Sequence, residues 1–313
     1  MKIQYDISII SPVYNEEGNI KELYGRIKGA VPGQYNWELI FIDDGSEDSS
    51  KQIIREICNC DNRVMLISLS RNYGQQVALT AGYDVAYGKV VISLDSDLQH
   101  PPELIPQMLD LWKNGNDIIF ARRRINKKLG WFNRTSSKLF YSLLKRISNI
   151  PIVENSADFR LMDQKVVKYL RRYRESTRFI RGIVSDMGFR RAVIDYEEGI
   201  RKAGKAKYSL YDLIDLSIRG VASLSDIPLT ISIFVGMFIS SLSIIYALWL
   251  AYYKIIYGMV SGLASILVGV FFIGGVQLIF IGILGEYIAS IFREVKRRPL
   301  YCISQIYGRE EKE

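Results

Sequence analysis

The chain has 313 residues, of which 24% are charged and 49% hydrophobic, and its formal net charge is +8 at pH 7. This length suits one large domain or two modest ones, and the charge favours anionic partners such as nucleotides or phospholipid headgroups. The three cysteines and the single histidine are too few for a disulfide framework or a zinc site. We therefore expect the main domain to lie in a reduced, cytosolic environment.

Residues 7–121 alternate between apolar runs and amphipathic segments. The sequence predicts helices between the runs, for example at 48–58 and 75–86, and five strands at 7–11, 38–42, 64–69, 90–94 and 117–121. This order is typical of a doubly wound α/β sheet that is mostly parallel. Polar residues follow each strand, so five polar strand ends should converge on one edge of the sheet, where such sheets bind ligands.

The end of the fourth strand carries two acids, Asp95 and Asp97, on either side of Ser96. Side chains alternate along an extended backbone, so both carboxylates should point to the same side. Paired oxygen ligands of this kind suit Mg²⁺ or Mn²⁺ together with a substrate diphosphate. An acidic turn without a ligand explains the same short pattern equally well, and the convergence of the other strand ends is what favours a site.

The composition changes sharply after Asp226. The chain has 27 uncharged residues between Asp226 and Lys254, and 31 between Lys254 and Glu286. Both stretches exceed the roughly 20 residues that cross a bilayer, so the sequence predicts two C-terminal transmembrane helices. The alternative is a helix hairpin buried in a soluble protein. Basic residues flank the pair, which predicts that both termini are cytoplasmic, and glycines in the second helix favour self-association.

Five motifs, in this order along the chain, resemble those of glycosyltransferase family 2, which has the GT-A fold. They are residues 11–17 (SPVYNEE), 43–46 (DDGS), 70–74 (SRNYG), 95–99 (DSDLQ) and 158–163 (DFRLMD). With the helix pair and residues 285–299, the chain looks like the bacterial polyprenyl-phosphate glycosyltransferases, relatives of dolichol-phosphate mannose synthase. The subgroup resembled is the undecaprenyl-phosphate, or bactoprenol, glucosyltransferases.

The resemblance implies four segments. Residues 1–207 would form a cytoplasmic GT-A glycosyltransferase domain, and 208–226 an amphipathic helix at the membrane surface. Residues 227–290 would form a two-helix transmembrane hairpin, and 291–313 a basic cytoplasmic tail. The protein would then be a multi-pass protein of the bacterial inner membrane.

The resemblance also implies a site for a nucleotide sugar and a metal ion. Mg²⁺ or Mn²⁺ would be bound by Asp95, Asp97 and Gln99, whereas His100 is expected to be a residue of the turn. The residues implied for the nucleotide sugar are Pro12, Tyr14, Asn15, Glu16, Asp44, Asp95, Ser96, Arg160 and Lys205. For Asn15 and Glu16, capping of the following helix is an alternative.

A polyprenyl phosphate would be the acceptor. By resemblance, its phosphate would contact Arg122, Arg134, Ser137 and Lys207, because cationic side chains match phosphate geometry. The basic loop at 201–208 would close over the phosphates, although it could instead bind lipid headgroups. The catalytic residues would be Asp97 and Asp158, with Asp158 positioning the sugar or, second, acting as a base. Asp163 is expected to cap the helix that follows it.

The function implied is an inverting, metal-dependent transfer of a sugar, glucose from UDP-glucose first, to undecaprenyl or another polyprenyl phosphate. The partners would be a nucleotide sugar, the lipid phosphate and the membrane, without nucleic acid and with self-association as a further expectation. One alternative keeps the fold and makes the chain a processive polysaccharide synthase. Another makes it a non-catalytic, membrane-anchored protein that binds nucleotides or transports a solute.

Overall fold

The computed structural model describes residues 5–124, 156–176, 178–197, 227–257 and 262–308. These residues fall into two compact units. The first unit contains the whole sheet and the helices that cover it, and the second contains two long helices, α9 (Ile227–Tyr257) and α10 (Leu263–Val295).

One eight-stranded sheet forms the centre of the first unit, in the order β7-β5-β6-β4-β1-β2-β3-β8. Strands β1 to β5 and β7 all run in one direction, while β6 and β8 run against their neighbours. The first four strands are mostly apolar and are buried along their whole length. The strands are β1 (Ile7–Val13), β2 (Trp37–Asp43), β3 (Val64–Leu69), β4 (Val90–Ser93), β5 (Ile118–Arg123), β6 (Ser156–Asp163), β7 (Arg191–Tyr196) and β8 (Ile303–Tyr307).

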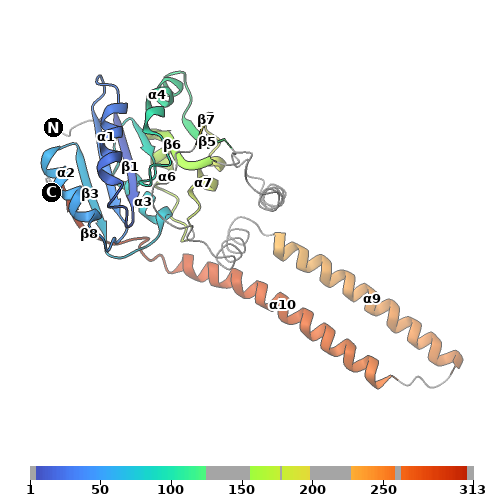
Figure 1. Ribbon diagram of the computed structural model, residues 1–313. Coiled ribbons are helices and arrows are strands. Elements are labelled where there is room, and N and C mark those ends of the chain that lie inside the picture. The colour runs from blue at the N-terminus through green and yellow to red at the C-terminus, as the bar shows by residue number, and fades with distance from the viewer. Residues whose placement is uncertain (1–4, 125–155, 177, 198–226, 258–261, 309–313) are drawn as a thin grey trace. The chain divides into compact units, whose positions relative to one another are not determined.

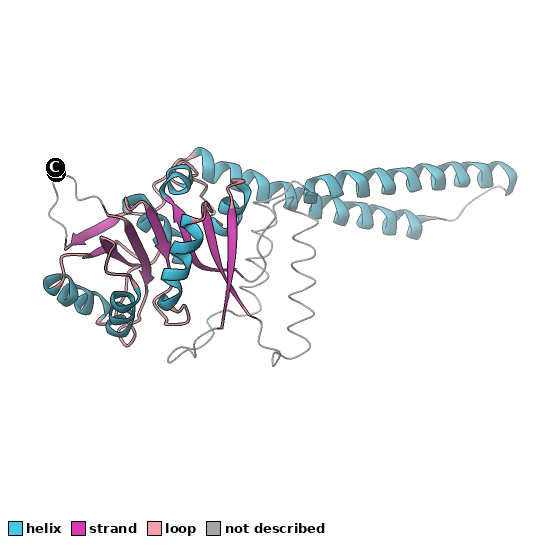
Figure 2. Ribbon diagram, turned by 90° about the horizontal axis from the view of Figure 1, so that it is seen from above, coloured by secondary structure: helices cyan, strands magenta, loops and turns pink. Residues whose placement is uncertain are grey.

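Helices cover both faces of this sheet, which gives three layers (Figures 1 and 2). One face packs against α1 (Ile20–Ala30), α2 (Ser50–Cys60) and α4 (Ile105–Lys113), which follows the short 3-10 helix η1 (Pro102–Leu104). The other face packs against α3 (Gln75–Val85), α6 (Gln164–Leu170) and α7 (Ile180–Asp186). The predicted mostly parallel α/β sheet is confirmed, and the carboxyl ends of β1 to β5 share one edge, called the site edge below.

The strand β6 enters the sheet between β4 and β5, antiparallel to both. Its first residues therefore lie at the site edge. In the β4–β6 register Ser93 is opposite Arg160, and two further steps place Asp158 level with Asp95. Two acids far apart in the sequence thus meet beyond the end of β4.

The strand β8 comes from the C-terminal end of the chain and pairs antiparallel with β3, as Figure 1 shows. The Ser70 N–H donates to the Cys302 carbonyl at 2.9 Å, and the Ser304 hydroxyl donates to the Ser68 carbonyl at 3.0 Å. The segment from Pro299 onward belongs to the first unit. Only a basic tail was predicted for 291–313, and the strand within it was missed.

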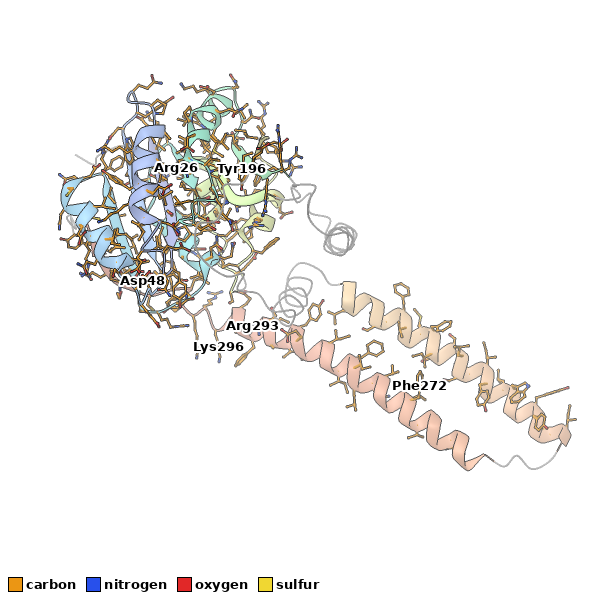
Figure 3. All side chains as sticks on the ribbon, in the orientation of Figure 1. Arg26, Asp48, Tyr196, Phe272, Arg293 and Lys296 are labelled. Atoms are coloured by element: carbon orange, nitrogen blue, oxygen red, sulfur yellow. The ribbon has the colours of Figure 1, made fainter. Side chains whose placement is uncertain are left out.

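The two helices of the second unit are longer than predicted. Their side chains are mostly apolar, and Phe272 is one example (Figure 3). Among the described residues, one segment, Phe272–Val295, is long and apolar enough to cross a membrane, and Ser232–Tyr246 is a shorter apolar stretch. Length and composition alone support the membrane assignment, and for one helix only. Glu286 pairs with Arg293, whose Nη2 lies 3.3 Å from the Glu286 Oε1.

Candidate active site

The loops after β1 and β2 are joined by hydrogen bonds at the site edge. Asn15 has a φ of +55°, its N–H donates to the Ser46 hydroxyl at 3.0 Å, and its Oδ1 accepts from the Glu47 N–H at 2.9 Å. Glu16 accepts from the Asn19 side chain at 2.6 Å, and Asn19 is the residue before α1. Asn15 therefore joins two loops and does not cap α1, while Glu16 contacts the N-cap residue. Next to them, Pro12 is buried and Tyr14 half-buried.

Asp44 anchors the loop that follows β3. Its two carboxylate oxygens accept from the N–H groups of Tyr73 and Gly74, at 2.7 and 2.8 Å. The side chain is buried, and burial raises the pKa of Asp44 although the two N–H groups oppose this rise. The neighbouring Gly45 has a φ of +77°, and a Cβ there would lie 2.7 Å from the backbone of Arg71 and Asn72. The sequence motif Asp-Gly thus lets two loops approach each other closely.

The segment after β4 is a turn that exposes alternate residues. Asp95, Asp97 and Gln99 are half-buried, while Ser96, Leu98 and His100 between them are buried. An extended backbone was predicted to place both acids on one side, but the chain turns here and Leu98 adopts a φ of +64°. A bulky residue in this conformation is strained, and such strain gathers at functional sites.

Asp95 is held from two sides. Gln75 at the start of α3 donates its amide to Oδ1 at 2.6 Å, and the Asp95 N–H donates to His100 Nδ1 at 3.0 Å. Burial raises the pKa of Asp95, and the nearby carboxylates of Asp158 and Asp97 add to the rise, whereas His100 and the charge of Arg181 oppose it. His100 itself is buried against Phe159 and Tyr196, so it is a residue of the turn, as expected.

The donor atoms of this turn fit a hard divalent cation. Asp97 accepts one hydrogen bond, from the Gln99 N–H to Oδ1 at 3.1 Å, and its side chain is half-buried. Within the described residues no three His, Cys, Asp or Glu side chains are grouped as a metal site. Mg²⁺ commonly uses one or two carboxylates and completes its shell with substrate phosphates and water. Two carboxylates and one amide are therefore an adequate set for Mg²⁺ or Mn²⁺ with a diphosphate.

Asp158 lies in a buried cluster with two arginines. Its oxygens accept from Arg160 Nη2, from Arg181 Nε and Nη2 at 3.2 Å each, and from Gln76 Nε2 at 2.9 Å. Its side chain is 1% exposed. Burial raises the pKa of Asp158, but the charges of Arg160 and Arg181 and the hydrogen bonds of Arg181 and Gln76 outweigh it and lower the pKa to about 2. So acidic a carboxylic group is a poor base near neutral pH.

Arg122, the first residue expected to contact the acceptor phosphate, is bound to Asp195 on β7. Its Nε and Nη2 donate to the two carboxylate oxygens at 2.6 and 3.1 Å. A phosphate that uses the same fork would have to replace Asp195. The other predicted phosphate and sugar ligands, Arg134, Ser137, Lys205 and Lys207, lie outside the described residues.

Three polar residues at this site were not predicted from the sequence: Gln75, Gln76 and Arg181. The two glutamines open α3, directly after the 70–74 motif, and each donates to one of the acids, Asp95 or Asp158. Their position just beyond a polar strand end was a usable signal. Arg181 stands in a basic, loop-rich region, and nothing local distinguishes it from its neighbours. The helix cap at Asp163 is confirmed by its hydrogen bond from the Lys165 N–H at 2.9 Å.

Comparison with known proteins decides the family. Residues 8–171 match the family described as glycosyl transferase family 2. The chain belongs to glycosyltransferase family 2. This glycosyltransferase is 38% identical to an uncharacterized glycosyltransferase of Synechocystis sp., over 97% of this chain and 96% of that protein.

Two further relatives of the glycosyltransferase carry more specific names. It is 39% identical to the bactoprenol glucosyl transferase of Shigella phage SfII, over 96% of this chain and 97% of that protein. It is 38% identical to a prophage bactoprenol glucosyl transferase homolog of Escherichia coli, over 96% and 99% of the two chains. Among solved structures, S. aureus TarS 1–349 in complex with UDP-GlcNAc has a TM-score of 0.49 at 18% identity, over 71% of this chain and 67% of that chain. That likeness is too distant to bear on the site.

Proposed function

We propose that this family 2 enzyme is inverting and metal-dependent, and that it transfers a sugar from a nucleotide sugar to a polyprenyl phosphate. The donor we expect first is UDP-glucose, and the place is the cytoplasmic face of a bacterial membrane. The observation that carries the proposal is the meeting of Asp44, Asp95, Asp97 and Asp158 at one edge of the sheet. Relatives of nearly equal length named bactoprenol glucosyl transferase support the choice of acceptor.

On this proposal the acidic turn receives the donor diphosphate. Asp95, Asp97 and Gln99 would hold Mg²⁺ or Mn²⁺, which when bound stabilises the negative charge of the departing diphosphate. Gln75 fixes the orientation of Asp95 through the 2.6 Å hydrogen bond to Oδ1. The loops tied together by Asn15 and Asp44 would receive the nucleoside, whose hydroxyl and ring N–H groups are donors to carbonyl and carboxylate oxygens.

The acceptor phosphate needs positioning more than activation. Its oxygen is already anionic near neutral pH, so it can attack the anomeric carbon without a strong base. The new carbon–oxygen bond forms on one face of the sugar as the bond to the diphosphate breaks on the other, which inverts the configuration. A pKa of about 2 for Asp158 agrees with a carboxylate that stays charged throughout and orients its neighbours.

We also propose that α9 and α10 form a transmembrane hairpin that keeps the enzyme near its lipid acceptor. Their described aliphatic and aromatic side chains are largely exposed in the chain itself, for example Ile244, Leu248 and Phe272 at 61%, 67% and 60%. An apolar surface of this length is stable in lipid rather than in water. If the proposal is right, alkaline carbonate washing should leave the full chain in the membrane fraction.

The decisive experiment uses the full chain in detergent with undecaprenyl phosphate, Mg²⁺ and a panel of radiolabelled nucleotide sugars. We expect a chloroform-extractable sugar lipid, formed fastest from UDP-glucose, lost on addition of EDTA and restored by excess Mg²⁺ or Mn²⁺. The anomeric configuration of the product should be opposite to that of the donor. Absence of product with every nucleotide sugar would refute the proposed function.

A pair of variants separates the metal role from stability. Asp97→Asn should lower turnover by at least about 100-fold, because charge stabilisation of a leaving group contributes on this scale. Asp110→Asn is the matched control, since Asp110 is an exposed acid on α4, and it should keep normal turnover. Full activity in Asp97→Asn would remove the metal-binding role from this turn.

A further inference from the structure

Among the described residues that bond to Asp158, only Arg181 is both charged and appreciably exposed. Its side chain is 35% exposed, compared with 1% for Asp158 and 0% for Arg160. It sits at the second position of α7, and the Gln76 side chain accepts from the Ile180 N–H beside it at 3.3 Å. The start of α7 is thus fixed to the start of α3, and this contact sets the position of Arg181.

Asp158 is itself enclosed by its partners. Both of its oxygens accept hydrogen bonds, and the donors come from Arg160, Arg181 and Gln76. A carboxylate that is 1% exposed and bonded on both oxygens does not present a surface to a substrate. At this point of the site edge, the group that a substrate can reach is the Arg181 guanidinium, which Asp158 holds in place.

Arg160 and Arg181 both bond to Asp158, and Arg160 is the more buried of the two. Arg160 Nε and Nη1 are buried without an acceptor among the described residues. Buried donors of a charged group are costly when they lack an acceptor, so Arg160 favours an anion close to the cluster. Arg181 lies near the acidic turn, because it bonds to Asp158 and the β4–β6 register places Asp158 level with Asp95.

We propose that Arg181 binds phosphate oxygens of a substrate, and that Asp158 is a positioning residue that holds its guanidinium in place. The proposal rests on the function proposed above and deepens it. Phosphate oxygens could come from the donor diphosphate or from the lipid phosphate, and a guanidinium matches both. The proposal changes the role expected for Asp158, from contact with the sugar to support of a residue that contacts phosphate.

The test compares Arg181→Gln with Arg174→Gln in the full chain in detergent. Arg174 is a fair control because it also forms a two-pronged bond with one carboxylate, Asp84, at 2.8 and 2.9 Å, and its side chain is 48% exposed. With an active wild type, we expect kcat/KM to fall about 100-fold or more in Arg181→Gln and less than about threefold in Arg174→Gln. Arg181→Lys, which keeps the charge but loses the fork, should have a kcat/KM between those of the wild type and Arg181→Gln.

Two binding measurements distinguish the sources of the phosphate. If Arg181 contacts the donor diphosphate, calorimetry with Mg²⁺ should show UDP binding at least about tenfold weaker in Arg181→Gln, with uridine binding unchanged. If it contacts the acceptor, UDP binding stays normal and the KM for undecaprenyl phosphate rises instead. Either result supports the proposal.

Asp158→Asn tests the positioning role. It should weaken UDP binding or raise the KM for undecaprenyl phosphate, whichever of the two Arg181→Gln changes. In the double variant, the free-energy loss calculated from kcat/KM should be smaller than the sum of the two single losses. Additive losses, or an Arg181→Gln enzyme that behaves like Arg174→Gln, would overturn the proposal. Loss of uridine binding and of thermal stability in both Arg181→Gln and Arg181→Lys would also overturn it, because Arg181 would then only maintain the fold. An inactive wild type would instead refute the proposed function.

Discussion

Replacing Gly45 by alanine should loosen the loops proposed to bind the nucleotide, by an amount that the structure lets us estimate. An L residue at the φ of +77° found here costs about 1–2 kcal/mol. The new Cβ would also lie 2.7 Å from backbone atoms of Arg71 and Asn72, which cannot stay in place. Their movement strains the hydrogen bonds from Tyr73 and Gly74 to Asp44. A hydrogen bond to a charged group contributes about 1.5–3 kcal/mol, so losing one gives a total of about 2.5–5 kcal/mol.

Hydrogen exchange measures this effect locally. In Gly45→Ala the amides of Tyr73 and Gly74 should exchange roughly tenfold to a hundredfold faster, and UDP should bind more weakly. The control is Gly115→Ala, because Gly115 has a φ of +89° but nothing within 4 Å of an added Cβ. The control should lose only the backbone cost of about 1–2 kcal/mol and keep normal exchange at 73–74. Equal exchange and equal UDP binding in the two variants would refute the reasoning.

Two further predictions concern the acids of the site. Because Asp158 has a folded pKa of about 2, below its ordinary 3.8, it should contribute about 2 kcal/mol of stability above pH 4 that is lost as the pH falls toward 2. The melting temperature of the wild type should therefore fall more steeply with pH across this range than that of Asp158→Asn. The same pH dependence in both proteins would contradict the assignment. Gln75→Leu removes the 2.6 Å bond to Asp95 and should raise the Mg²⁺ concentration for half-maximal turnover about tenfold, with Gln52→Leu on the exposed face of α2 as control. An unchanged Mg²⁺ requirement would show that Gln75 does not orient a metal ligand.

The sequence predicted the first five strands closely because each is a continuous apolar run that ends in polar residues. β3 begins and ends at the predicted residues, and the others differ from prediction by one or two residues at either end. The strand β6 gives no such signal, since it carries Arg160 at its buried centre and enters the sheet antiparallel between two earlier strands. Its pairing depends on a contact between residues about 70 positions apart, such as Ser93 and Arg160, which local patterns do not encode.

The sequence predicted where the acids of the candidate site lie, but it did not predict which residues they contact. The motifs placed Asp44, Asp95 and Asp97 at one edge, and the structure agrees. The hydrogen-bond partners that define their roles come from other segments: Asp44 bonds to the loop after β3, and Asp158 bonds to Arg181 on α7. The motif alone predicted Asp158 as a sugar ligand or a base, whereas its bonds to two arginines support the positioning role proposed above. Spacing in the sequence shows which acids are present, and only the fold shows which cations neutralise them.

The C-terminal strand bears on where the catalytic domain ends. Without β8, β3 would be the last strand of the sheet, and its free N–H and C=O groups would face solvent. The β8 segment also supports the loop after β3, because Ser70 at the start of that loop donates to the Cys302 carbonyl at 2.9 Å. That loop ends at the Tyr73 and Gly74 amides that bind Asp44. A chain that stops at residue 207 therefore lacks a strand that supports the loop bonded to Asp44. Since β8 follows α10 after only residues 296–302, the sheet is complete only when both long helices have been made.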